Sequence, residues 1–87
     1  REEYFKFTET IANTYRLDKL EFIRALAKVP NKVNIVAYAM YDARAYGTLE
    51  DDNLSDDLEL IISSKELTDE EKDTGVRLLN AYLECGA

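Results

Sequence analysis

The chain has 87 residues, of which 46% are hydrophobic, with one cysteine and no histidine. This length allows one domain with a modest core, and a lone cysteine cannot form an internal disulfide. The absence of histidine removes the commonest general base and transition-metal ligand, and no apolar run approaches the ~20 residues of a membrane span.

The net charge of -7 is concentrated in the second half of the chain. Residues 1–46 contain eight Lys/Arg and six Asp/Glu, a net charge of +2, whereas residues 47–87 contain three Lys/Arg and twelve Asp/Glu, a net charge of -9. A field of one sign attracts a basic partner and repels nucleic acid. We therefore expect a partner protein with a basic surface, no direct nucleic-acid contact and no membrane contact.

A first helix is predicted from about Glu2 to Tyr15. Its apolar residues recur at spacings of three and four, which places them on one stripe: Tyr4, Phe5, Phe7, Ile11, Ala12 and Tyr15. The stripe is rich in aromatic rings, as in a helix that docks into a groove, although a place in the core is the commoner explanation for such rings.

A second helix is predicted to begin at Asp18, whose side chain would cap the free amide groups of the first turn. Glu21 follows three residues later, as in a capping box, and Leu17 and Phe22 have the spacing of a hydrophobic staple. Pro30 ends this segment because it lacks an amide donor and restricts the residue before it.

A third helix is predicted over residues 32–47, with Asn31 as its cap and Gly47 as its end. Its apolar residues occupy two faces, so we expect it at the centre of the fold. A buried strand over residues 33–41 remains open, although four alanines between positions 37 and 45 favour a helix.

The stretch TLEDDNLSDDLELII, residues 48–62, carries six acidic side chains. Apolar residues at i, i+4, i+7 and i+8 predict a helix from Leu54, and acids in its first turn suit the helix dipole. A calcium loop beginning at Asp51 would require glycine at position 56 and glutamate at position 62, which are Asp56 and Ile62. We therefore expect no metal site here.

A fifth helix is predicted to open with the capping box Thr68-Asp69-Glu70-Glu71. Its inward stripe is predicted to comprise Val76, Leu79, Tyr82 and Leu83, with Leu78 beside it. Gly75, inside this helix, costs ~1 kcal/mol relative to alanine. It either permits a close helix contact or has no packing role.

These segments predict an all-α fold, a compact bundle of four to five short helices in a single small domain over residues 1–87. The chain starts at Arg1 rather than Met, which also fits a fragment of a longer chain.

The expected function is that of a non-catalytic protein–protein interaction or regulatory domain, with no enzyme activity, catalytic residue, cofactor or metal. One cysteine favours the cytoplasm. An acidic C-terminal surface would steer the partner and exposed aromatic rings would anchor it. The candidate residues are Asp51, Asp52, Asp56, Asp57, Glu70 and Glu71 for charge, and Tyr38, Tyr41 and Tyr46 for anchors.

Two alternatives remain open. The tyrosines are equally well explained as core or boundary residues. The alternative function is that of an acidic inhibitor that mimics nucleic-acid phosphates and blocks a DNA- or RNA-binding enzyme, as counter-defence proteins of phages and mobile elements do.

Overall fold

The computed structural model describes residues 1–49 and 53–87, and over these the chain is all-α, without a strand. The predicted bundle is confirmed, and residues 33–41 form a helix. None of the helices within these two ranges is both long enough and apolar enough to cross a membrane. The elements are α1 Glu2–Leu17, α2 Lys19–Ala27, the 3-10 helix η1 Pro30–Lys32, α3 Val33–Tyr46, α4 Leu54–Ile62 and α5 Asp69–Cys85.

Three helix ends have the residues that the sequence predicts. The Asp18 side chain accepts a hydrogen bond from the Glu21 amide at 3.0 Å, which caps α2. At the start of α5, the Thr68 amide donates to Glu71 Oε1 at 2.8 Å and the Glu71 amide donates to Thr68 Oγ1 at 3.1 Å, which completes the capping box. Gly47 follows α3 with φ of +85°, a left-handed conformation that favours glycine.

Two local predictions are wrong. Asn31 does not cap α3, because it lies inside η1 and Lys32 precedes the helix without a side-chain cap. Leu17 does not form a buried staple with Phe22, because 87% of its surface stays exposed while Phe22 is buried.

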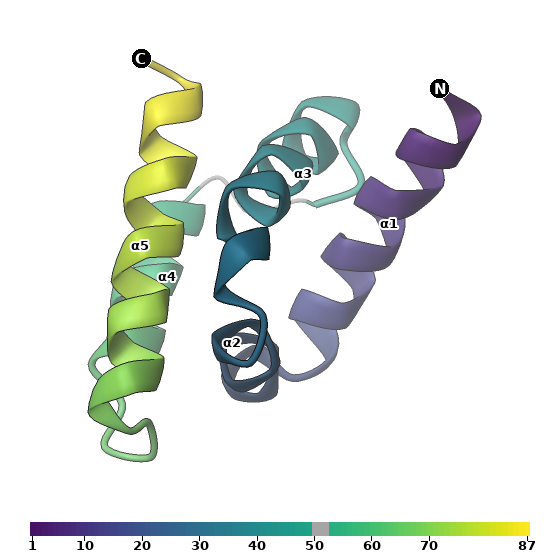
Figure 1. Ribbon diagram of the computed structural model, residues 1–87. Coiled ribbons are helices and arrows are strands. Elements are labelled where there is room, and N and C mark those ends of the chain that lie inside the picture. The colour runs from purple at the N-terminus through teal and green to yellow at the C-terminus, as the bar shows by residue number, and fades with distance from the viewer. Residues whose placement is uncertain (50–52) are drawn as a thin grey trace.

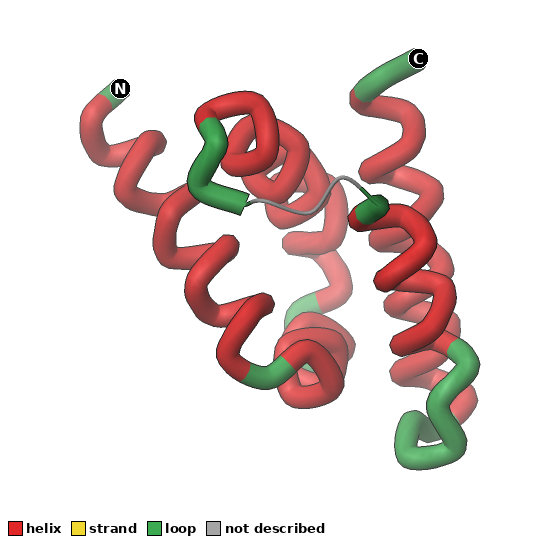
Figure 2. Tube along the Cα trace, turned by 180° about the vertical axis from the view of Figure 1, so that it is seen from behind, coloured by secondary structure: helices red, strands yellow, loops and turns green. Residues whose placement is uncertain are grey.

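The third helix is central, as expected. In Figure 1, α3 stands between α1 and α5, and it packs against both. Figure 2 shows the opposite side, where α4 lies beside α5 and is joined to it by the loop over residues 63–68. Fully buried side chains from all five helices meet between these layers: Ala12, Ile23, Ala37, Met40, Leu58 and Leu78. Burying each large aliphatic side chain contributes roughly 1.5–3 kcal/mol.

The buried face of α5 differs from the predicted stripe. Leu78, Leu79 and Tyr82 are buried, but Val76 and Leu83 are 40% and 51% exposed. The face turns instead toward Thr74 and Gly75, because α2, α3 and α4 all pack on that side of α5.

Gly75 has a packing role. A Cβ atom at this position would lie 2.7 Å from Ile62 Cγ1, well inside ordinary contact distance. The glycine therefore allows α4 and α5 to approach more closely than a side chain would permit.

Candidate functional site

The acidic candidates on α4 differ in their exposure and in their contacts with other helices. Asp56 is exposed, whereas Asp57 is half-buried and accepts a hydrogen bond from the Tyr15 hydroxyl. The Lys19 ammonium also lies 2.8 Å from Asp57 Oδ2 and 5.3 Å from the centre of the Tyr15 ring. Asp57 thus links α4 to α1 and α2, and Asp56 is the better placed of the pair to meet a partner. Asp51 and Asp52 lie outside the described residues.

The same contrast recurs at the start of α5. Glu70 is exposed. The Glu71 carboxylate accepts from the Thr68 amide and lies 4.0 Å from Arg24 Nε, so it serves the helix start and the contact with α2. Asp56 and Glu70 therefore remain as the exposed acidic candidates among the described residues.

The three tyrosine candidates lie on α3 but do not share one environment. Tyr38 is 59% exposed. Tyr46 is 51% exposed, with its ring centre 5.3 Å from that of Phe5. Tyr41 is half-buried, with its ring centre 6.1 Å from that of the buried Tyr82, which is the position expected of a residue at the boundary of the core.

An apolar groove lies between α1, α2 and the start of α3. It encloses about 530 Å³. Figure 1 shows the three helices that line it, with α1 beside α3 and α2 lying below α3. Its lining residues are Phe7, Ile11, Thr14, Leu17, Asp18, Glu21, Phe22, Ala25, Leu26, Val29, Lys32, Ile35 and Val36, hereafter the groove.

One face of α2 forms the floor of the groove. Ala25 and Leu26 follow Phe22 by three and four positions, which keeps these side chains on one side of α2, and Val29 continues the floor just beyond the helix. Ala25 is exposed and small, so the floor is hollow at its middle. From its N-cap Asp18 to its C-cap Lys28, α2 gives the groove a length of roughly 15 Å, at ~1.5 Å per helical residue.

Aliphatic side chains at the ends of helices form the rim. Leu17 is 87%, Val29 45% and Ile35 47% exposed. Each lies at a junction between elements, where the neighbouring helices do not cover it. Water therefore contacts apolar surface from three segments of the chain at one place, as at sites of protein interaction.

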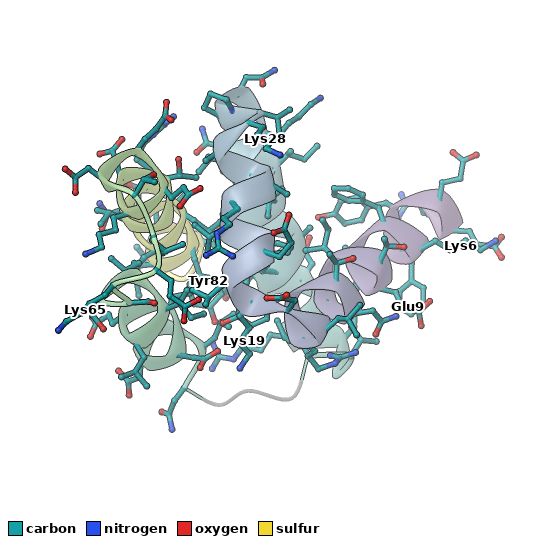
Figure 3. The ribbon with its side chains drawn as sticks, turned by 90° about the horizontal axis from the view of Figure 1, so that it is seen from below. Lys6, Glu9, Lys19, Lys28, Lys65 and Tyr82 are labelled. Atoms are coloured by element: carbon teal, nitrogen blue, oxygen red, sulfur yellow. The ribbon has the colours of Figure 1, made fainter. Side chains whose placement is uncertain are left out.

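Opposite charges stand at the two ends of the groove. Asp18 and Glu21 line the end where α2 begins, and Lys32 lines the end where α3 begins. Lys28 is exposed at the same end as Lys32, and Figure 3 shows Lys28 and Lys19 at opposite ends of α2. Over residues 1–49 and 53–87, Glu21, Lys28 and Lys32 form no ion pair with another side chain.

The sequence prediction did not identify the groove. The apolar spacing places Phe7 and Ile11 on the inward stripe of the first helix, and it places Leu17 in a staple on Phe22. The available signal was a surplus of apolar residues at helix junctions, at positions 17, 29 and 35. Periodicity alone does not show which neighbour leaves such residues uncovered.

The titratable groups with shifted pKa values lie outside the groove. Burial, followed by the hydrogen bond that the Tyr4 hydroxyl donates to Asp42, raises the pKa of Tyr4 to about 12. Burial also raises the pKa of the Cys85 thiol, followed by the charges of Asp42 and Glu84, which disfavours a reactive thiolate. No group of three or more Cys, Asp or Glu in the described parts of the chain is arranged to hold a metal ion.

Comparisons of this chain with protein-family models, with curated proteins and with solved structures find no significant match.

Proposed function

We propose that this chain is a non-catalytic protein-interaction domain that binds an amphipathic helix of a partner protein in the groove. The observation that carries the proposal is the apolar hollow of about 530 Å³ rimmed by the exposed side chains of Leu17, Val29 and Ile35. A helix that places one apolar stripe into a groove is a common mode of peptide recognition.

The dimensions of the groove suit a short helix. A floor of roughly 15 Å matches about ten helical residues, which present three or four apolar side chains on one face. Covering a large aliphatic side chain contributes roughly 1.5–3 kcal/mol, while association itself costs several kcal/mol. The expected affinity is therefore micromolar, as in a regulatory contact that forms and dissociates readily.

The acidic second half of the chain has a supporting role in this proposal. Asp56 and Glu70 are exposed on helices outside the groove, where their charge attracts a basic partner over several ångströms without contacting its helix. The proposal includes a cytoplasmic location, which a single free cysteine favours.

Selection from a displayed library of peptides of about 12–20 residues, a length that spans the groove, tests the proposal. Selected peptides are then titrated by fluorescence anisotropy against the wild type and Ala25→Lys, which places a long charged side chain across the floor. Asn80→Lys is the matched control, because it adds the same charge at an exposed site on α5, outside the groove.

A second pair of variants tests the rim. Leu17→Ala removes a groove side chain that is 87% exposed, and Leu60→Ala removes a leucine on α4 that is 71% exposed. We expect Ala25→Lys to weaken binding about tenfold or more and Leu17→Ala to weaken it severalfold, with both controls close to wild type. Binding that survives Ala25→Lys but is lost in Asp56→Asn with Glu70→Gln would move the site to the acidic surface and overturn the proposal.

A further inference from the structure

The charges at the two ends of the groove give it a direction. We infer that the groove selects an amphipathic helix that runs antiparallel to α2, with acidic residues in its first turn and basic residues in its last turn. This inference rests on the proposed function, because it specifies the chemistry and orientation of the helix that the groove binds.

The geometry sets which residues meet. The groove follows α2 from its N-cap Asp18 to Val29, just beyond the helix, so a helix lying along it has one end beside Asp18 and Glu21 and the other beside Lys32, near the exposed Lys28. An antiparallel helix starts at the lysine end and finishes at the acidic end. Its acidic first turn then lies beside the ammonium group of Lys32, with the exposed Lys28 at the same end, and its basic last turn lies beside the carboxylates of Asp18 and Glu21.

The inferred partner also satisfies its own helix dipole. Acids stabilise the first turn of a helix and bases stabilise the last, because of the partial charges at the two ends. α2 has this arrangement itself, with Glu21 in its first turn and Arg24 in its last turn. Two helices of this kind place unlike charges opposite one another when antiparallel and like charges opposite one another when parallel. In antiparallel docking, the charges of the partner helix therefore suit both its own dipole and the charges at the ends of the groove.

Two designed peptides of about 12 residues, long enough to fill the floor, test the inference. Both are acetylated and amidated and carry leucines at i, i+3, i+4 and i+7. One has glutamates in its first turn and lysines in its last turn, and the other has these charges exchanged. Their affinities are measured for the wild type and for the charge-exchanged variant Glu21→Lys with Lys32→Glu. Asp18 is kept because it caps α2.

The wild type is expected to bind the first peptide about fivefold or more tightly than the second at low salt, since exposed ion pairs contribute modestly and are screened by salt. The charge-exchanged protein is expected to reduce or reverse this ratio. Comparing the two proteins cancels the difference in intrinsic helicity between the peptides. A nitroxide at the N-terminus of the first peptide should broaden the amide resonances around Lys32 rather than those around Glu21.

The outcomes separate the inference from the proposed function. Equal affinity for both peptides that Ala25→Lys abolishes, or broadening around Glu21, would leave the groove as a binding site and overturn its direction. Binding of neither peptide, or binding unchanged by Ala25→Lys, would overturn both. Sedimentation of the protein alone adds one outcome, since a dimer disrupted by Ala25→Lys would identify the occupant as a second copy of this chain and overturn the proposal of a partner protein.

Discussion

Replacing Gly75 by alanine tests whether α4 and α5 pack too closely for a side chain. The added methyl group would lie 2.7 Å from Ile62 Cγ1 and 3.5 Å from Ile62 Cδ1. Unstrained carbon contacts are ~3.5–4.0 Å, so either Ile62 or the helix must move. Alanine gains ~1 kcal/mol of helix stability over glycine, whereas forcing a methyl group into a packed contact costs roughly 1–3 kcal/mol. We therefore expect Gly75→Ala to lower the free energy of unfolding by up to ~2 kcal/mol.

The sign of the effect should depend on Ile62. Ile62→Ala removes both of the close atoms, and the remaining neighbour, Ile23 Cγ2, lies at an ordinary 3.9 Å. In that background, Gly75→Ala keeps its helix gain without the clash and should raise the free energy of unfolding by up to ~1 kcal/mol. The two substitutions should therefore couple by roughly 1–3 kcal/mol.

The free energies come from urea denaturation followed by far-ultraviolet circular dichroism, with the slope m checked for constancy. Gly86→Ala is the control, because its nearest neighbour, Tyr41 Cε2, lies at 3.5 Å. This control should change stability by less than ~0.5 kcal/mol. A Gly75→Ala protein more stable than wild type, or an equal effect with and without Ile62, would refute the close-packing interpretation.

Three further predictions concern stability and pH. Thr68→Ala should lower the free energy of unfolding by ~1 kcal/mol, whereas Thr68→Ser should retain most of the stabilisation by the cap, because serine keeps the hydroxyl group. Urea denaturation measures both, and equal losses would contradict the capping role of Thr68. Asp57→Ala should lower the free energy of unfolding by roughly 1–3 kcal/mol by removing a charge-assisted hydrogen bond, and Asp56→Ala should lower it by less than ~1 kcal/mol. The reverse order would contradict the structural role of Asp57. The pKa of Tyr4 is raised from 10.0 to about 12, so the folded state holds its proton more tightly, and the stabilisation present below pH 10 is lost as the pH rises to about 12. Ultraviolet titration, with Tyr4→Phe assigning the step, should show a lower pKa for Tyr4 in Asp42→Asn; an unchanged pKa would contradict this.

The sequence by itself determined the helices and several of their ends. Period and composition predict five helical segments, and side chains at Asp18 and Thr68 supply hydrogen bonds that depend on residues three positions away. Gly47 ends α3 by a backbone preference of its own residue type. These features were predictable because each depends on interactions within one or two turns of the same segment.

The tertiary structure decided which apolar surfaces are covered. Leu17 and Val76 have the spacing of buried residues, yet both are exposed because no neighbouring helix reaches them. Asp56 and Asp57 are adjacent and chemically identical, but only Asp57 faces Tyr15 and Lys19 across the fold. The groove arises in the same way, since five short helices in a small domain bury only part of their apolar surface. Periodicity specifies that a residue is apolar and on which side of its helix it lies, whereas the angles at which helices cross decide whether another segment or a partner covers it.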